Sequence, residues 1–221
     1  MTPKFNPNLH HRRSIRLKNY DYSQSGLYFI TICTQNRECL FGEIIDDRIN
    51  LNIAGKMVEN VWLAIPQIFS DTKLHEYIIM PNHFHAIIEI VGADSISAQN
   101  ADSISAHTGN GRVVRADMEY NRVEMDSFRA EMDSLRAEMD SAPTGTDVSL
   151  PKIVQTFKRY TTIEYIKMVK QNILPSFEKR IWQRNYYEHI IRDEKSYRNI
   201  AEYIINNPLK WKEDDYYVQI D

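Results

Sequence analysis

The chain has 221 residues, of which 43% are hydrophobic and 26% are charged, and these values are ordinary for a globular protein. No apolar run approaches the ~20 residues of a membrane-spanning helix, and no basic leader precedes a cleavage site, so we expect a cytoplasmic protein without a membrane partner. The formal net charge of −3 hides an uneven distribution, because residues 93–147 contain eleven acidic residues and five arginines, which leaves 22 basic and 19 acidic residues elsewhere. The first eighteen residues contain no acid, and such a basic arm suits a polyanionic partner.

The N-terminal part predicts an arm followed by strands and one helix. Residues 1–25 are polar and basic, and their two prolines oppose regular structure. Residues 27–34 are β-branched and aromatic, which is typical of a central strand. Residues 40–53 predict a hairpin that turns at Asp46 and Asp47. From Ala54 to about Phe69, apolar residues recur at helical spacing, which predicts an amphipathic helix.

The second part of the chain predicts three further strands and two helices. The strands are apolar runs bounded by turn signals, and each helix begins at a capping residue and ends before a proline. These elements are strands at about 74–80, 84–91 and 181–191, a helix from Ser149 to about Lys170, and a helix from Asp193 to about Asn207.

The order of these elements contains a ferredoxin-like βαββαβ core with an appended C-terminal helix, so we predict an α+β fold with an antiparallel sheet. Helices on one face of such a sheet would leave its other face free. The predicted organisation is a basic N-terminal arm (1–25), a single domain (26–92 and 148–212), an insertion (93–147) and a tail (213–221).

The insertion is repetitive. Residues 93–106 contain Ala-Asp-Ser-Ile-Ser-Ala twice, and residues 115–142 repeat every seven, with four methionines alternating with Phe128 and Leu135. This spacing is that of a short coiled coil, which leaves a homodimer open. However, Met specifies helix packing poorly, short helices are marginal in water, and tandem copies are typical of expansion in a surface loop. We therefore favour a mobile or transiently helical insertion that carries no catalytic residue.

Two histidines open the strand predicted at 84–91. Because alternate side chains of a strand share a face, His83 and His85 would lie on one face, about 7 Å apart at ~3.3 Å per residue, with Phe84 in the core. Two imidazoles held in this way can bind one metal ion. The alternative is a pair of polar residues on the solvated face of a half-buried strand.

The last helix carries Tyr203 and Asn207, four residues apart on one face. A tyrosine hydroxyl beside a carboxamide that completes a metal site is suited to nucleophilic attack on a phosphodiester. The alternative is an aromatic core contact followed by a helix stop at Pro208. The rival nucleophiles are Tyr160, Tyr165, Tyr186 and Tyr187, of which Tyr160 is interpreted as packing.

Three ordered blocks resemble a known family. The sequence Met-Pro-Asn-His-Phe-His ending at His85 is similar to the His-hydrophobe-His motif of single-tyrosine HUH transposases. The block from Ile181 to Arg192 and the block from Glu202 to Trp211 resemble the C-terminal signatures of their REP-associated tyrosine transposase branch, which is IS200-like. The resemblance covers roughly residues 10–92 and 148–212 and omits the repeats.

The resemblance implies an enzyme that cleaves and rejoins single-stranded DNA near hairpins through a 5′-phosphotyrosine. It makes His83 and His85 the metal ligands, Tyr203 the nucleophile and Asn207 the third ligand. Glu188 and His189 fall in the Trp-x-x-x-x-x-Glu-His block and are expected in a supporting role. Members of this family use Mg²⁺ or Mn²⁺, and imidazole ligands favour Mn²⁺.

The expected partner is therefore single-stranded or hairpin DNA. The stacking candidates are Trp182, Tyr186 and Tyr187. Two alternatives are a domesticated, non-catalytic protein that binds hairpin DNA and a metal phosphodiesterase that activates water. The candidate phosphate contacts are Arg12, Arg13, Arg16, Lys18, Lys158, Arg159, Arg180 and Arg184.

Overall fold

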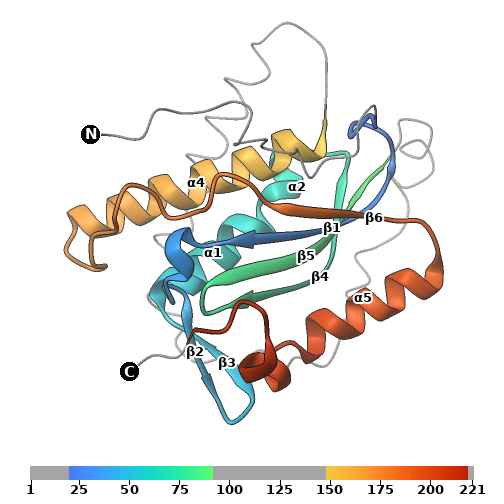
Figure 1. The fold of residues 1–221 in the computed structure, drawn as a ribbon. Helices are drawn as coiled ribbons and strands as arrows, with labels where there is room; N and C mark the ends of the chain where they lie inside the picture. The colour runs from blue at the N-terminus through green and yellow to red at the C-terminus, as the bar shows by residue number, and fades with distance from the viewer. Residues whose placement is uncertain (1–19, 92–147, 219–221) are drawn as a thin grey trace, which may run out of the picture.

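The four long strands form one antiparallel sheet at the centre of the computed structural model, which describes residues 20–91 and 148–218 (Figure 1). The strand order across the sheet is β4-β5-β1-β6, so the first strand lies between two strands that follow it much later in the chain. The strands are β1 (Gly26–Cys33), β4 (Thr72–Met80), β5 (His83–Ile90) and β6 (Tyr187–Ile191).

This topology is that of the ferredoxin-like βαββαβ fold. A helical connection separates β1 from β4, β4 and β5 form a hairpin, and a second helix precedes β6. Every neighbouring pair of strands is antiparallel. The predicted α+β fold class is confirmed.

One face of the sheet carries the main core. The β1 side chains Tyr28, Ile30 and Ile32 are fully buried beneath the helices. Trp62 lies at the centre, with its ring centroid 4.9 Å from that of Phe84. The helices on this face are α1 (Ile53–Leu63), α2 (Ile65–Ile68) and α4 (Leu150–Lys170).

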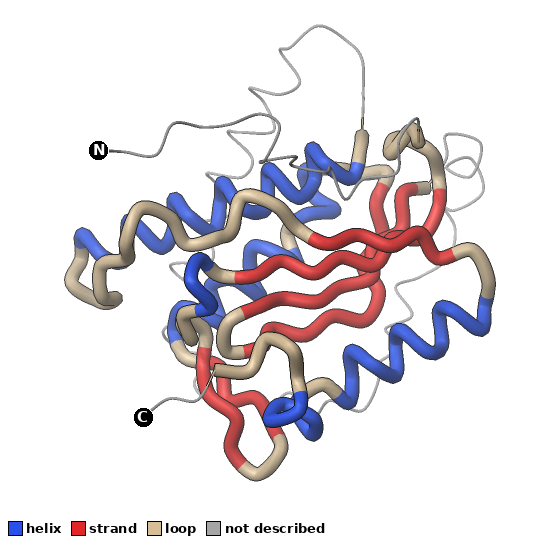
Figure 2. Tube along the Cα trace, in the orientation of Figure 1, coloured by secondary structure: helices blue, strands red, loops and turns tan. Residues whose placement is uncertain are grey.

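The opposite face is covered by α5 (Glu194–Asn206), as Figures 1 and 2 show. Phe29, Ile87 and Ile191 of the sheet pack against Ala201 and Ile204 of this helix in a second, smaller core cluster. The expectation that helices on one face would leave the other free is therefore wrong. The reason is that α5 is itself amphipathic and buries its apolar stripe on this face.

Two predicted elements are shorter in the structure. The helix expected over 54–69 is divided into α1 and α2, and Pro66, which has no backbone N–H, lies in the first turn of α2. The strand expected from 181 begins only at Tyr187, since Trp182 makes an isolated bridge to Thr34 and its ring is buried in the core. Burial of Trp182 excludes the base-stacking role considered for it.

The predicted hairpin forms as β2 (Gly42–Ile45) and β3 (Arg48–Leu51), a separate two-stranded sheet. Asp46 and Asp47 connect the strands with φ of 47° and 58°, the left-handed pair that a two-residue hairpin turn requires. Among the helices described in these ranges, none is long and apolar enough to cross a bilayer.

Candidate active site

Strand β5 places His83 and His85 on the face covered by α5. Their partners across the sheet are Cys33 and Thr31 of β1, and the intervening Phe84 points into the main core. Both imidazoles are buried, and their ring centroids are 4.5 Å apart. The period-two alternation of the strand thus brings the two rings together without any turn or loop.

The hydrogen bonds of His83 define which of its nitrogen atoms is free. Both amide hydrogens of Asn82 are directed at backbone carbonyls, those of Arg37 at 3.2 Å and Tyr216 at 2.8 Å. The Asn82 Oδ1 atom therefore accepts from His83 Nδ1 at 2.9 Å, which leaves the lone pair on Nε2. That Nε2 atom is buried and has no hydrogen-bond partner among the residues described.

His85 is held at both of its ring nitrogens. Its Nδ1 atom is 2.8 Å from the Thr31 hydroxyl, and its Nε2 atom is 3.2 Å from the hydroxyl oxygen of Tyr203. The Phe29 ring stacks on the imidazole at a centroid distance of 5.5 Å. The imidazole is therefore fixed in orientation, with one nitrogen directed at α5.

Helix α5 brings Tyr203 to this position. Asp193 caps the helix by accepting from the Ser196 backbone N–H at 2.8 Å, and the apolar stripe docks the helix on the sheet. The Tyr203 ring lies 5.1 Å from the His85 ring and 6.2 Å from the Phe29 ring. The hydroxyl therefore reaches the histidine pair while 43% of the residue stays exposed.

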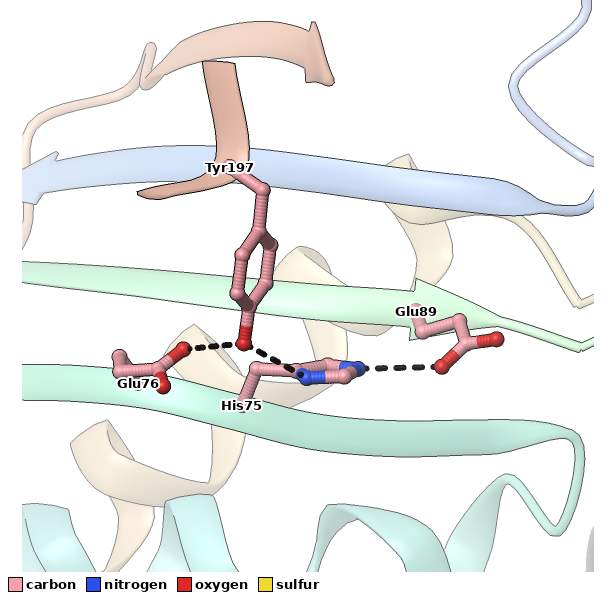
Figure 3. Close-up of polar contacts among 4 residues, drawn as sticks. All are labelled: His75, Glu76, Glu89 and Tyr197. Atoms are coloured by element: carbon pink, nitrogen blue, oxygen red, sulfur yellow. Dashed lines mark hydrogen bonds and ion pairs between the residues drawn. The ribbon is translucent and has the colours of Figure 1, made fainter. Parts of the chain in front are cut away.

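A polar network ties the first half of α5 to the edge of the sheet (Figure 3). The Tyr197 hydroxyl donates to Glu76 Oε2 at 2.7 Å and lies 3.3 Å from His75 Nδ1. His75 Nε2 is in turn 3.0 Å from Glu89 Oε2. The ladder between β4 and β5 is irregular between Leu74 and Tyr77, and this irregularity accommodates the contacts of both His75 and Glu76 with one tyrosine.

Asn207 follows Tyr203 by one helical turn, at the end of α5. Its side chain is buried, and its Nδ2 atom donates to Asp214 Oδ2 at 3.0 Å. Its Oδ1 atom is buried and, within the described ranges, has no hydrogen-bond partner. The carboxamide oxygen is thus directed toward the site and is available as a ligand.

The C-terminal segment supplies a carboxylate that no sequence pattern predicts. After η3 (Pro208–Glu213) the chain folds back, and ligand atoms of Asp214, His83 and His85 lie within 4.8 Å of one another. The Tyr216 ring contacts the His83 ring at a centroid distance of 4.7 Å, with the two planes tilted by 42°. Asp214 and Tyr216 belong to the predicted tail (213–221), and the run Asp-Asp-Tyr-Tyr from Asp214 to Tyr217 has no spacing that predicts this contact.

Burial sets the protonation states of the site. It lowers the pKa of His83 to about 3, with the neighbouring Asn207 carboxamide opposing this shift and the Arg37 guanidinium adding to it. Burial, together with the neighbouring His83, also places the pKa of His85 well below its usual value. Both imidazoles are therefore neutral near pH 7, the form that binds metals.

Burial, followed by the charge of Asp214, raises the pKa of Tyr203 to about 12, and the neighbouring Asn207 carboxamide partly offsets this rise. The hydroxyl is accordingly protonated near neutral pH. A divalent cation beside it would favour the phenolate, because a nearby positive charge stabilises an anion.

The residues present fit a divalent metal ion. Two potential ligand atoms, His83 Nε2 and Asn207 Oδ1, are buried without hydrogen-bond partners among the described residues. A buried polar atom without a partner costs free energy unless something else contacts it. With His85 and the Asp214 carboxylate, the donor set is two imidazoles and two oxygens, which can bind a divalent metal ion.

A cleft of about 660 Å³ opens beside Tyr203. Its walls come from β1, β5, β6, α5 and the C-terminal segment, and they include His85, Asn207, Asp214 and Tyr187. Of the rival tyrosines, Tyr187 therefore also faces this cleft. Tyr160 and Tyr165 are buried in the main core, and Tyr186 packs against that core.

The other expected site residues that the structure describes do not line this cleft. Glu188 pairs with Ile30 and so occupies the sheet face opposite the site, whereas His189 pairs with Phe29 on the site face and is exposed. The Lys158 ammonium donates to the backbone carbonyl of Gln183 at 2.9 Å, so it holds a connecting segment in place. Arg159, Arg180 and Arg184 are exposed, and Arg12, Arg13, Arg16 and Lys18 lie outside the described residues, as does the repeat insertion.

Comparison with known proteins gives one relative of equal length. A protein of Haemophilus influenzae, described only as uncharacterized, is 40% identical over 218 residues, which cover 99% of both chains. A provisionally named REP-associated tyrosine transposase of the same organism is 52% identical over 33 residues, or 15% of this chain and 19% of its own. This second match confirms the resemblance found in the sequence. No family profile matches.

Two solved structures are similar at low identity. One is a REP-associated tyrosine transposase bound to a REP hairpin, with a TM-score of 0.44 and 17% identity over 88% of this chain and 73% of that one. The other is a provisionally named transposase from Deinococcus radiodurans, with a TM-score of 0.38 and 12% identity over 86% of this chain and 95% of that one.

Proposed function

This chain belongs to the same family as the full-length Haemophilus influenzae relative, and we propose that it is a transposase-like enzyme that cleaves and rejoins single-stranded DNA through Tyr203. The single observation that carries the proposal is the distance of 3.2 Å between the Tyr203 hydroxyl oxygen and His85 Nε2. This contact joins the proposed nucleophile to a pair of buried, neutral imidazoles. The name of the relative matched over 33 residues, a REP-associated tyrosine transposase, supports REP-associated DNA as the substrate class.

In the proposed reaction the Tyr203 oxygen attacks a backbone phosphorus atom. The bond from phosphorus to the 3′-oxygen breaks, the tyrosine loses its proton, and the leaving oxygen takes one up as a free 3′-hydroxyl. The 5′-phosphate stays on Tyr203, so the phosphodiester bond energy is kept in the linkage. Attack by a 3′-hydroxyl on the phosphotyrosine then rejoins DNA without ATP.

The protein side chains give this reaction its geometry. Phe29 and the docked face of α5 orient the Tyr203 ring, and Asn82 and Thr31 hold the two imidazoles in fixed orientations. His83, His85, Asn207 and Asp214 are the residues that would hold the divalent ion. When bound, Mg²⁺ or Mn²⁺ supplies positive charge that polarises the phosphoryl group.

The test is a covalent trap. The full chain is incubated with end-labelled single-stranded hairpin DNA and Mn²⁺, and adducts are resolved by denaturing electrophoresis. We expect an adduct that Tyr203→Phe abolishes and that EDTA prevents. Tyr217→Phe, which alters a tyrosine packed on Trp211 outside the cleft, is the matched control and should give the wild-type yield.

The proposal fails if Tyr203→Phe forms as much adduct as wild type. An adduct lost only in Tyr187→Phe would move the nucleophile to the rival tyrosine in the cleft. Salt-sensitive hairpin binding without an adduct in any metal would favour the non-catalytic DNA-binding protein. DNA turnover without a protein-linked product would favour the metal phosphodiesterase.

A further inference from the structure

The cleft beside Tyr203 is much larger than an ion requires. Its volume is about 660 Å³, whereas one water molecule occupies ~30 Å³ in the liquid. The volume falls within the range of roughly 300–1,000 Å³ of pockets that bind small organic ligands. The residues that would hold the metal ion account for only one end of this cleft.

Helix α5 lines the cleft with a polar stripe. Asn199, Glu202 and Asn206 all face it, and their spacing of three and four residues places them on one side of the helix. Tyr203 belongs to the same stripe, with its hydroxyl 3.2 Å from His85. Any group that contacts the stripe is therefore directly beside the proposed nucleophile.

An aromatic ring forms another wall. Tyr187 of β6 pairs with Thr31, so its side chain lies on the same sheet face as His85. Its ring meets the edge of Phe29 at a centroid distance of 6.2 Å, and 49% of the residue is exposed. A supported but exposed aromatic ring is the kind of surface on which unpaired bases stack.

The charge of the cleft selects against a backbone phosphate. Its lining contains four carboxylates and one lysine, namely Glu202, Glu213, Asp214, Asp215 and Lys210. Apart from the metal end, such a surface repels phosphate and accepts hydrogen bonds from amino groups. A neutral nucleobase with an amino group fits these properties, because carboxylates accept hydrogen bonds from base amino groups.

We propose that this cleft binds the nucleobase that flanks the cleaved phosphodiester, stacked on Tyr187 and hydrogen-bonded through its amino group to Glu202. Asn199 and Asn206 supply carboxamides that match the remaining donors and acceptors of the base edge. The site takes cytosine, adenine or guanine and disfavours thymine, which has no amino group and whose single N3–H lies between two carbonyls that the carboxylate repels. This inference rests on the proposed function, since the base belongs to the strand that Tyr203 attacks.

The test is a binding selection on the full chain. The probe is a single-stranded library with one fixed hairpin flanked by random nucleotides, and bound molecules are recovered in Mn²⁺ and sequenced. In wild type we expect one flanking position at which thymine is depleted. Glu202→Gln should reduce that depletion about tenfold, because an amide can also donate to a thymine carbonyl.

Two further variants separate base choice from general damage. Glu194→Gln lies on the same helix, and its partner is the exposed Arg198 at 2.9 Å, so it should leave the base preference unchanged. Tyr187→Ala should weaken binding of all sequences about tenfold through lost stacking while keeping the preference. Circular dichroism confirms that each variant is folded.

The inference is overturned if wild type shows no preference at any flanking position, or if Glu202→Gln keeps the wild-type preference. Adduct formation on the same library is scored separately. If a base preference depends on Glu202 but no adduct forms, the cleft binds a base and the proposed cleavage through Tyr203 is wrong. If adducts form without such a preference, the proposed cleavage stands and the base-binding role of the cleft is wrong.

Discussion

The histidine pair illustrates how burial alone prepares a side chain for metal binding. His83 is fully buried, its Nδ1 atom is hydrogen-bonded to Asn82, and its Nε2 atom is left as a buried lone pair. Desolvation disfavours the imidazolium, so a proton does not compete with a metal ion for that nitrogen near neutral pH. The cost of this arrangement is sensitivity to acid.

The pH dependence of stability follows from the lowered pKa of His83. The unfolded chain, with a histidine pKa of about 6.5, binds a proton that the folded chain excludes down to about pH 3. Stability is therefore fully present above pH 6.5 and is lost as the pH falls toward 3. In EDTA, we expect this histidine alone to cost about 2 kcal/mol of unfolding free energy between pH 7 and pH 5.

Urea unfolding of His83→Gln at these two pH values checks the prediction, since the variant should lose less stability on acidification than wild type. His189→Gln, which alters an exposed histidine on the same sheet face, should keep the wild-type difference. An equal loss in wild type and His83→Gln would mean that the imidazole is charged in the folded state.

At the scale of the element, α5 matters most because it carries the proposed nucleophile and covers the sheet face that holds both histidines. Its apolar contacts centre on Ala201 and Ile204, and its polar contacts on Tyr197 (Figure 3). Burial, followed by the hydrogen bond to Glu76, raises the pKa of Tyr197, so its hydroxyl remains a donor. These attachments, together with the Tyr203–His85 contact, hold the helix on the sheet.

Removing the polar attachment should therefore loosen the helix. Tyr197→Phe keeps the ring but leaves Glu76 and His75 without their shared partner, and we expect a loss of about 1–2 kcal/mol of unfolding free energy. We also expect faster amide hydrogen exchange in the first turns of α5 than in α4. Tyr20→Phe, which removes a partly buried hydroxyl near the hydroxyl of Tyr28, is the control and should leave exchange in α5 unchanged. Unaltered exchange of α5 in Tyr197→Phe would show that the apolar stripe and the Tyr203–His85 contact hold the helix without Tyr197.

For the whole molecule, the described residues form a complete ferredoxin-like fold without the repeats. The sheet, the helices on both faces and the candidate site all come from residues 20–91 and 148–218. Insertions between elements are tolerated where they do not contribute to the core. The insertion is therefore predicted to be dispensable for the proposed chemistry.

Replacing residues 93–147 by a flexible Gly/Ser linker tests this prediction. The shortened chain should keep the unfolding free energy within about 1 kcal/mol and should still form the Tyr203-dependent adduct. Sedimentation of both chains measures the effect on assembly. If the shortened chain is folded but inactive, the repeats have a role in the reaction. If the full chain is a dimer and the shortened chain is a monomer, the repeats form the coiled coil that joins the two copies.

Much of the fold follows from local patterns. The β-branched run at 27–34, the His-Phe-His alternation and the capping residue Asp193 each express a rule that acts within a few residues, and their elements form as predicted. The strand expected from Ile181 begins only at Tyr187, because the apolar side chains of Ile181 and Trp182 are buried in the core without forming a regular strand pair. Trp182 donates instead to the Thr161 hydroxyl at 2.7 Å, a partner on a distant helix.

The sequence by itself determined the elements, the fold class and the pairing of His83 with His85 on one face, because strand periodicity acts between neighbours along the chain. Only the tertiary structure decided that α5 covers the second face of the sheet and that Asp214 returns to the histidines. It also placed Glu188 on the far side and Tyr187 in the cleft. These outcomes depend on contacts between residues far apart in sequence, for which no local spacing leaves a signal.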